Sequence, residues 1–159
     1  MNYLYDLFTN FYLVSAVCGW LVAQLIKTFT GFFKLQEFSV RTLLFGTGGM
    51  PSSHTAAACG LAVACALKDG FGSSHFAMGA LLAMVIMIDA IGVRRETGKQ
   101  SRALNLIVDE MFSSEHAGTL DMQFKELIGH TPLQVFFGAV TGIVTACLLY
   151  LIPVFSGAA

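Results

Sequence analysis

Four long apolar stretches constrain the fold of this chain more than any other feature. A helix that crosses a bilayer needs roughly 17 to 25 mostly apolar residues, and the stretches that approach this length cover residues 8–26, 54–68, 76–93 and 132–155. Charged residues make up only 12% of the chain, against about 25% in soluble domains. The 159 residues therefore predict an all-α, polytopic membrane helix bundle of four transmembrane helices, in one integral membrane domain over residues 1–159.

Two further elements complete the predicted bundle. Residues 28–38, TFTGFFKLQEF, are aromatic but too polar to cross, so we expect a re-entrant or interfacial segment there. In the polar stretch after the third span, apolar residues recur at helical spacing at Leu104, Ile107, Val108 and Met111. They predict an amphipathic cytoplasmic helix that lies along the membrane surface or caps the bundle.

Basic residues mark one side of the membrane. The loops after the first and third spans hold nearly all of them, whereas the opposite side has only Lys68. By the positive-inside rule, both termini lie outside and these two loops lie in the cytoplasm. The short basic stretches do not form a nucleic-acid surface. The N-terminus lacks the basic region and cleavage site of a signal peptide, so we expect the first span to be retained.

Small residues within the spans predict close helix packing. Ala56, Gly60 and Ala64 recur every four residues in the second span, and Gly138 and Gly142 do so in the fourth. This spacing lets helix backbones approach closely in lipid. The Gly138-x-x-x-Gly142 pair also offers a face for a homodimer. The four cysteines lie in apolar runs without metal-ligand spacing, so we expect free, buried thiols at Cys18, Cys59, Cys65 and Cys147.

Two histidines stand at predicted helix starts on the same side of the membrane. His54 lies in GTGGMPSSHTAAACG, where Ser52 or Ser53 can cap the second span and the helix N-terminus favours a phosphate. His130 precedes Thr131-Pro132, and proline suits the first turn of the fourth span. Alone, each histidine reads as an interfacial or capping residue. Together, one can attack phosphorus while the other protonates the leaving oxygen.

Charged residues at the same side form a candidate phosphate clamp. Asp89 lies inside an apolar span, where a charge needs a partner such as an arginine or an imidazole. Arginine and lysine side chains stabilise phosphoryl oxygens, although these positions also suit ordinary positive-inside or snorkelling anchors. The predicted phosphate-binding cations are Lys27, Lys34, Arg94, Arg95 and Lys99.

The other two histidines lack this setting. His75 falls on the opposite face of the membrane and His116 lies in the polar loop, so we expect both to be solvated. No His-x-x-x-His pair is present, and the acidic residues near His116 have the spread of a solvated helix face. The sequence therefore predicts neither a metal nor another cofactor.

Three motifs in order resemble a known family. GGMPSSHTA, DAIGVRRETGKQ and GHTPLQV are similar to the small, divergent branch, found in bacteria and plastids, of the type 2 phosphatidic acid phosphatase and vanadium-dependent haloperoxidase superfamily. The resemblance covers residues 24–142. It implies that His130 forms a phosphohistidine and that His54 protonates the departing alkoxide or activates water. It also implies that backbone near Ser53 and the basic residues hold the phosphate, without a metal.

Three parts of the superfamily pattern differ in this chain. The Ser-Arg pair upstream of the nucleophilic histidine falls on Gln123 and Phe124, so the arginine is expected from Arg94 or Arg95. The first basic motif survives only as Lys27 and Lys34. The acidic residue that orients the nucleophile falls on Gln134, unless Asp89 takes that role. An amide can hold one histidine tautomer but cannot stabilise an imidazolium as a carboxylate does.

These observations leave three functional hypotheses. The first is a lipid-phosphate phosphatase of the bacterial inner membrane with its active site on the cytoplasmic face. Its substrate candidates, in order, are phosphatidylglycerophosphate, phosphatidate and a polyprenyl diphosphate. The second, favoured by Gln134, is a non-catalytic protein that binds anionic lipid headgroups on a decayed phosphatase scaffold. The third, suggested by Asp89 within a span, is a small transporter subunit.

Overall fold

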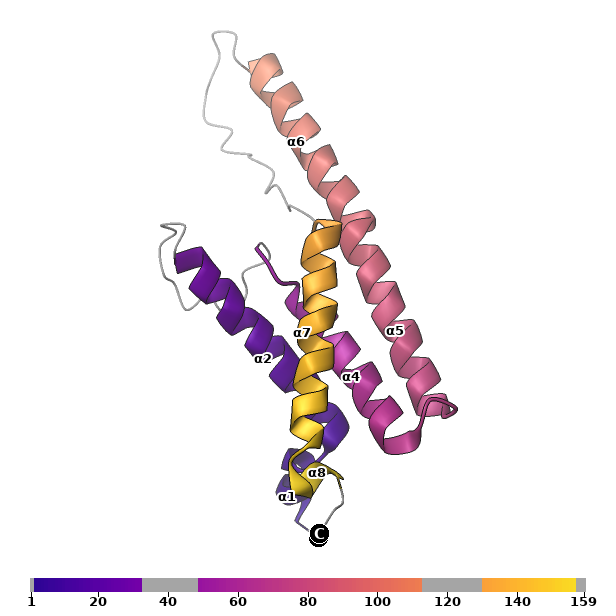
Figure 1. The fold of residues 1–159 in the computed structure, drawn as a ribbon. Coiled ribbons are helices and arrows are strands. Elements are labelled where there is room, and N and C mark those ends of the chain that lie inside the picture. Colours follow the sequence, from indigo (N-terminus) through magenta and orange to yellow (C-terminus); the bar gives the residue numbers. More distant parts are fainter. Residues whose placement is uncertain (1, 33–48, 113–129, 157–159) are drawn as a thin grey trace.

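The computed structural model describes residues 2–32, 49–112 and 130–156, and every element in these ranges is a helix (Figure 1). The all-α prediction is therefore confirmed for the described chain. The helices, in order, are α1 (Tyr3–Phe8), α2 (Phe11–Phe32), α4 (Ser53–Asp69), α5 (Ser74–Ile91), α6 (Val93–Phe112), α7 (Pro132–Tyr150) and α8 (Pro153–Ser156).

Three helical segments of the described chain are long and apolar enough to cross a membrane. They are Phe11–Thr30, Ser74–Val108 and Pro132–Tyr150. The surfaces of these segments carry many exposed large apolar side chains, which suit contact with lipid. These features support membrane association. The predicted second span, now α4, is shorter at 17 residues and rich in alanine.

Helix α4 forms the centre of the bundle. It packs against α2, α5 and α7, and α2 also contacts α7. Ten of the 17 residues of α4 are buried, and all ten are small, half of them alanines, so its neighbours approach its backbone closely from several sides. Its central position explains its composition: large side chains on α4 would push the surrounding helices apart.

Glycines make these close approaches possible. A Cβ atom at Gly142 of α7 would overlap the Ala56 carbonyl oxygen of α4, and one at Gly60 of α4 would lie 2.9 Å from the Ser15 carbonyl oxygen of α2. The predicted role of these glycines in helix packing is thus confirmed. The proposed dimer face is corrected: Gly138 and Gly142 are buried against α4 of the same chain and are not available to a second copy.

We expect Gly142→Ala to destabilise the protein, although alanine is the better helix former. The added methyl group meets backbone atoms of α4, which cannot move aside as a side chain can. Overpacking of this kind costs about 1–3 kcal/mol. The measurement is the thermal unfolding midpoint in detergent. Gly72→Ala is the matched control, because a Cβ at Gly72 meets nothing within 4 Å; equal midpoints for the two variants would contradict the packing argument.

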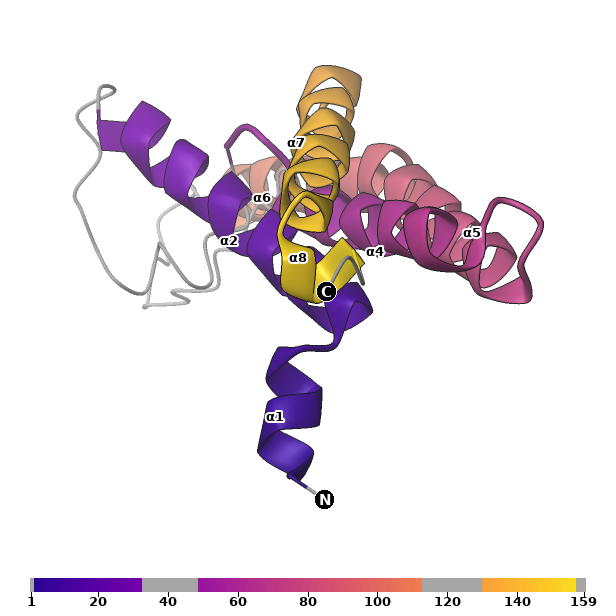
Figure 2. The ribbon, with the colours of Figure 1, turned by 60° about the horizontal axis from the view of Figure 1, so that its bottom comes forward.

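Several helix boundaries differ from the sequence prediction. The first span starts at Phe11 and continues to Phe32, so the first five residues of the predicted re-entrant segment, 28–32, belong to α2; the rest of that segment lies outside the described residues. The last span ends at Tyr150, before the Pro153 that opens α8. Near the chain ends, Phe11 contacts the rings of Tyr150 and Phe155. Figure 2 shows α1 projecting away from the bundle.

Helix α6 extends α5 instead of folding over the bundle. The Gly92 N–H donates to the Ile88 carbonyl at 2.8 Å, and the Glu96 N–H donates to the Gly92 carbonyl at 3.0 Å, so helical hydrogen bonds pass through the junction. Figure 1 shows α6 projecting beyond the ends of α4 and α7. The predicted amphipathic helix is present, but over its described residues it does not cap the bundle. No proline lies between Ile88 and Glu96, so the helix is not broken between α5 and α6.

Candidate active site

The starts of α4 and α7 and the ends of α2 and α5 meet at one end of the bundle, as the alternation of the spans predicts (Figure 1). Three contacts between segments fix this arrangement. The Ser52 N–H donates to the Gln134 carbonyl at 2.9 Å, and the His130 N–H donates to the Ala90 carbonyl at 3.2 Å. The Thr30 hydroxyl donates to the Met50 carbonyl at 3.5 Å. The candidate site is the region that these contacts bring together.

The N-terminus of α4 is capped by Ser52. Its side-chain oxygen accepts hydrogen bonds from the Thr55 N–H at 3.4 Å and the Thr55 hydroxyl at 3.0 Å. The choice that the sequence left open is therefore settled: Ser52 is the cap and Ser53 is the first helical residue, and both side chains are buried. The first N–H groups of a helix have no acceptor within the helix, and they carry the positive end of its dipole. This end of α4 therefore suits an anion.

Lys27 lies beside the loop that leads into α4. Gly49 has a φ of +92°, a conformation that glycine adopts without strain. A Cβ atom at Gly49 would lie 3.1 Å from the Lys27 Cγ atom, so the aliphatic stem of the lysine passes along this loop. Lys27 is half-buried near the end of α2. The structure thus brings this predicted phosphate ligand next to the Pro-Ser-Ser-His segment.

The N-terminus of α7 is a capping box. The Thr131 hydroxyl accepts from the Gln134 N–H at 3.4 Å, and the Gln134 side-chain oxygen accepts from the Thr131 N–H at 2.9 Å. Pro132 occupies the first helical position, as predicted. Further along α7, a Cβ atom at Gly138 would lie 2.5 Å from the Ser52 carbonyl oxygen, so α7 contacts the capping residue of α4 directly. Two helix N-termini therefore lie side by side.

The capping box also fixes the orientation of His130. The side chain of His130 is buried, and its Nδ1 lies 3.1 Å from the Gln134 side-chain oxygen. That oxygen already accepts the Thr131 N–H, and a carbonyl oxygen can only accept. The His130 Nδ1 must therefore donate its hydrogen. In the neutral ring, Nε2 then carries the lone pair, which is the state that a nucleophilic imidazole requires.

His54 and Asp89, the other two predicted catalytic residues, are each within two residues of a backbone group that joins two helices at the site. His54 is exposed in the first turn of α4, two residues after the Ser52 N–H that contacts α7. Asp89 is half-buried in the last turn of α5, next to the Ala90 carbonyl that accepts the His130 N–H. The end of the bundle thus combines a buried, oriented imidazole with an exposed one.

Three of the predicted phosphate-binding cations, Arg94, Arg95 and Lys99, lie on α6. Lys99 lies on α6, where its Nζ pairs with the Glu96 carboxylate at 2.6 Å and both side chains are exposed. Arg94 and Arg95 fall in the first turn of α6, and the Arg95 side chain is exposed. Lys34 lies outside the described residues. The structure places the Lys27 stem beside the loop that leads into the Pro-Ser-Ser-His segment, and phosphate binding by the three cations of α6 stays a prediction.

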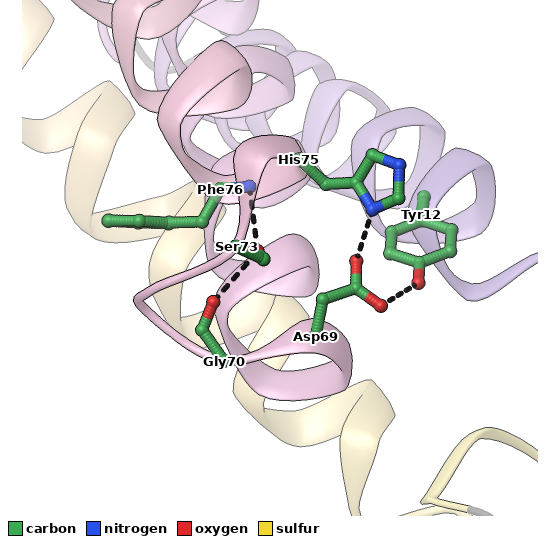
Figure 3. A network of polar contacts seen from close by, with 6 residues as sticks. All are labelled: Tyr12, Asp69, Gly70, Ser73, His75 and Phe76. Atoms are coloured by element: carbon green, nitrogen blue, oxygen red, sulfur yellow. Dashed lines mark hydrogen bonds and ion pairs between the residues drawn. The ribbon is translucent and has the colours of Figure 1, made fainter.

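A polar cluster that the sequence pattern does not predict lies at the opposite end of the bundle, at the last residue of α4 (Figure 3). We expected His75 to be solvated; its side chain is 64% exposed, but its Nδ1 lies 3.0 Å from the Asp69 carboxylate. The other carboxylate oxygen accepts from the Tyr12 hydroxyl at 2.8 Å. An acidic residue at a helix C-terminus opposes the helix dipole, so Asp69 itself signalled the need for a partner.

The last observations concern the side chains that could bind a metal ion. The four cysteines are free thiols, and the predicted burial holds for Cys59 and Cys65, whereas Cys18 is half-buried and Cys147 is exposed. Within the described ranges, no three His, Cys, Asp or Glu side chains lie together as a metal site would require.

Comparison with known proteins identifies a family and a related bacterial membrane protein. The sequence model of the Divergent PAP2 family matches residues 8–145. The uncharacterized membrane protein YuiD of Bacillus subtilis (strain 168) is 38% identical over 153 residues, which cover 91% of this chain and 96% of that protein. No solved structure matches the chain.

Proposed function

This chain belongs to the divergent PAP2 family, and on that premise we propose that it is a membrane phosphatase that hydrolyses a lipid phosphomonoester or diphosphate. The match to the Divergent PAP2 family confirms the resemblance that we inferred from the three motifs. The proposal goes further than the family, since it assigns an activity, a mechanism and residues to this chain.

The proposed reaction has two steps. The His130 Nε2 lone pair attacks phosphorus, a nitrogen–phosphorus bond forms, and the ester oxygen departs with a proton from His54. Water then attacks the phosphohistidine with His54 as the general base, which releases inorganic phosphate and restores both imidazoles. The open N–H groups at the start of α4 and the Lys27 ammonium are proposed to hold the phosphoryl oxygens. No metal or other cofactor takes part in these steps.

One observation carries this proposal: the hydrogen bond from His130 to Gln134. It supports catalysis over simple headgroup binding, because binding an anion needs a protonated or donor nitrogen and not an oriented lone pair. The Gln134 oxygen accepts from both Nδ1 and the Thr131 N–H, so the lone pair lies on Nε2.

The substrate and the membrane arrangement follow from the same premise. We propose that α4 is a fourth crossing, because 17 helical residues extend about 26 Å, close to the thickness of a bilayer core. The helix ends that carry His54 and His130 would then face the cytoplasm, in a bacterial inner membrane, by the positive-inside rule. Phosphatidylglycerophosphate is the first candidate substrate, followed by phosphatidate and a polyprenyl diphosphate. A homodimer remains a proposal, and it would use a face other than the glycines of α7.

The test is phosphate release by the purified protein in detergent over these three lipids, followed by trapping with a ³²P-labelled substrate. We expect release from at least one lipid, an acid-labile and base-stable labelled protein that marks phosphohistidine, and inhibition by vanadate, which mimics pentacoordinate phosphorus. Glycerol 3-phosphate, which carries the phosphate without the lipid, is the control substrate. Wild-type protein that releases no phosphate from any of the three lipids would refute the proposal.

The second candidate is a non-catalytic binder of anionic lipid headgroups, and Gln134 favours it. The superfamily places an acidic residue at this position, whereas an amide leaves a developing imidazolium without a counter-charge. This candidate predicts saturable binding of the lipids above with no labelled protein. The trapping experiment therefore distinguishes the two functions.

A further inference from the structure

A cavity of about 330 Å³ lies between α2, α4 and α5. Its walls are almost entirely apolar and include Leu61 and Cys65 of α4 together with Met78 and Leu82 of α5. Met78 and Leu82 are 61% and 47% exposed, so the α5 wall also belongs to the outer surface of the bundle. In a helix bundle within a membrane, such a surface borders the hydrocarbon chains of lipids.

The same cavity has a polar end. Tyr12 and His75 line it, and both contact the Asp69 carboxylate, which lies at the end of α4. Because Nδ1 of His75 faces Asp69, the other ring nitrogen lies on the side of the ring away from the carboxylate, as Figure 3 shows. Asp69 thereby orients an exposed imidazole in the first turn of α5, where the helix dipole favours an anion. Because the Asp69 carboxylate only accepts, the second ring nitrogen donates to a phosphate oxygen in the imidazolium form, in which both ring nitrogens carry a hydrogen.

We propose that this cavity binds one membrane phospholipid, with an acyl chain between α4 and α5 and the phosphate at His75. An apolar slot that ends in an oriented, exposed imidazole fits a molecule with a hydrocarbon tail and an anionic head. A wholly apolar ligand would leave the imidazole unused, and a free phosphate would leave the slot unfilled. The occupant is therefore a lipid and not either part alone.

This lipid is distinct from the proposed substrate. The polar end of the cavity lies at Asp69, in the last turn of α4, whereas His54 lies 15 residues earlier in the first turn, so the two are about 22 Å apart along the helix. The bound lipid would thus occupy the opposite leaflet. It would fill the gap beside α4 that α2 and α5 leave, and it requires no catalytic activity.

The test uses phosphatidylglycerol with a photoreactive diazirine in one acyl chain, crosslinked to the purified full chain and mapped by peptide mass spectrometry. We expect crosslinks concentrated at residues 61–82. Diacylglycerol with the same labelled chain, which lacks the phosphate, should crosslink there about tenfold less, since the imidazole contact is lost. Excess inorganic phosphate should not compete. Labels spread evenly over the exposed faces of α2, α5 and α7 would overturn the proposal, because they would show surrounding lipid only.

Matched variants separate the cavity from the rest of the surface. Cys65→Phe fills the slot from α4 and should lower crosslinking about tenfold, because the phenyl ring displaces several methylene groups of the acyl chain from the cavity. Cys147→Phe makes the same change at an exposed position of α7 and should have no effect. Leu82→Trp fills the slot from the α5 wall if Cys65→Phe fails to fold. His75→Gln should reduce crosslinking of phosphatidylglycerol to the level of diacylglycerol. Unchanged crosslinking in both slot-filling variants would refute the site.

Discussion

His130→Ala should abolish the release of phosphate from the lipid substrate, with a loss on the order of 10³-fold or more. The reason is that the variant lacks the atom that bonds to phosphorus, so labelled protein should also disappear. The measurements are the initial rate of phosphate release and the amount of ³²P retained on the protein. His130 is buried beside the starts of α4 and α7, so unfolding midpoints of the variant and the wild type must be compared in parallel.

Two companion variants distinguish loss of the nucleophile from loss of structure. In His130→Gly, added imidazole should enter the vacated space and restore part of the release, with phosphoimidazole as the product. His54→Ala should lose about 10² to 10⁴-fold on the lipid substrate, because the leaving alkoxide needs a proton. With an aryl phosphate, whose leaving group needs no proton, His54→Ala should still form phosphohistidine. A His130→Ala protein that releases phosphate at the wild-type rate would refute the mechanism.

The parts of the fold that could be predicted are those that depend on local pattern. Apolar stretches located α2, α5 and α7 to within six residues at either end, because helices in lipid must satisfy their own backbone. Ser52, Thr131 and Pro132 mark helix starts through capping chemistry that acts within one turn. Alternation of the spans then placed both histidines at one end. Each of these inferences uses residues that are neighbours in the sequence.

The parts that could not be predicted depend on direction and on distant contacts. The spacing of apolar residues predicted that α6 is a helix, but it could not predict the direction of α6 relative to α5. Gly92, which joins the two helices, permits either a bend or a straight continuation. The sequence predicts that the basic residues of α6 join the histidines, and it does not show the pair that the Lys99 ammonium forms with Glu96. Glycine spacing likewise predicted close packing without naming the partner helix. That partner is α4 of the same chain and not a second copy.

The cluster at the far end of the bundle shows the same limit. Tyr12 and Asp69 lie 57 residues apart, and nothing in the local sequence of either residue points to the other. His75 and Asp69 are separated by a tight turn, and only the geometry of that turn brings the imidazole onto the carboxylate. Side-chain pairing between helices requires the packing of the bundle, which the pattern of one helix does not contain.

Gln134→Leu should lower the turnover number by roughly 10² to 10⁴-fold, the range expected when a catalytic histidine loses the group that fixes its tautomer. Leucine has a similar size but cannot accept the hydrogen from Nδ1. The hydrogen bond between the Ser52 N–H and the Gln134 carbonyl uses only backbone atoms at position 134, so the junction of α4 and α7 should persist. The measurement is the turnover number and KM on the lipid substrate. Gln100→Leu, an exposed position on α6, is the matched control and should leave both unchanged.

Gln134→Glu makes the complementary test. The glutamate side chain has the same length, so it can accept from both the Thr131 N–H and the His130 Nδ1, and glutamate also suits a capping box. Its carboxylate adds the counter-charge that an amide lacks, which stabilises the imidazolium formed when Nε2 bonds to phosphorus. We therefore expect turnover at or above the wild-type value. If Gln134→Leu turned over as fast as the wild type, the tautomer would not depend on Gln134, and the observation that carries the proposed function would lose its force. If instead only the glutamate variant formed phosphohistidine, the native chain would be a headgroup-binding protein that lacks one carboxylate for catalysis.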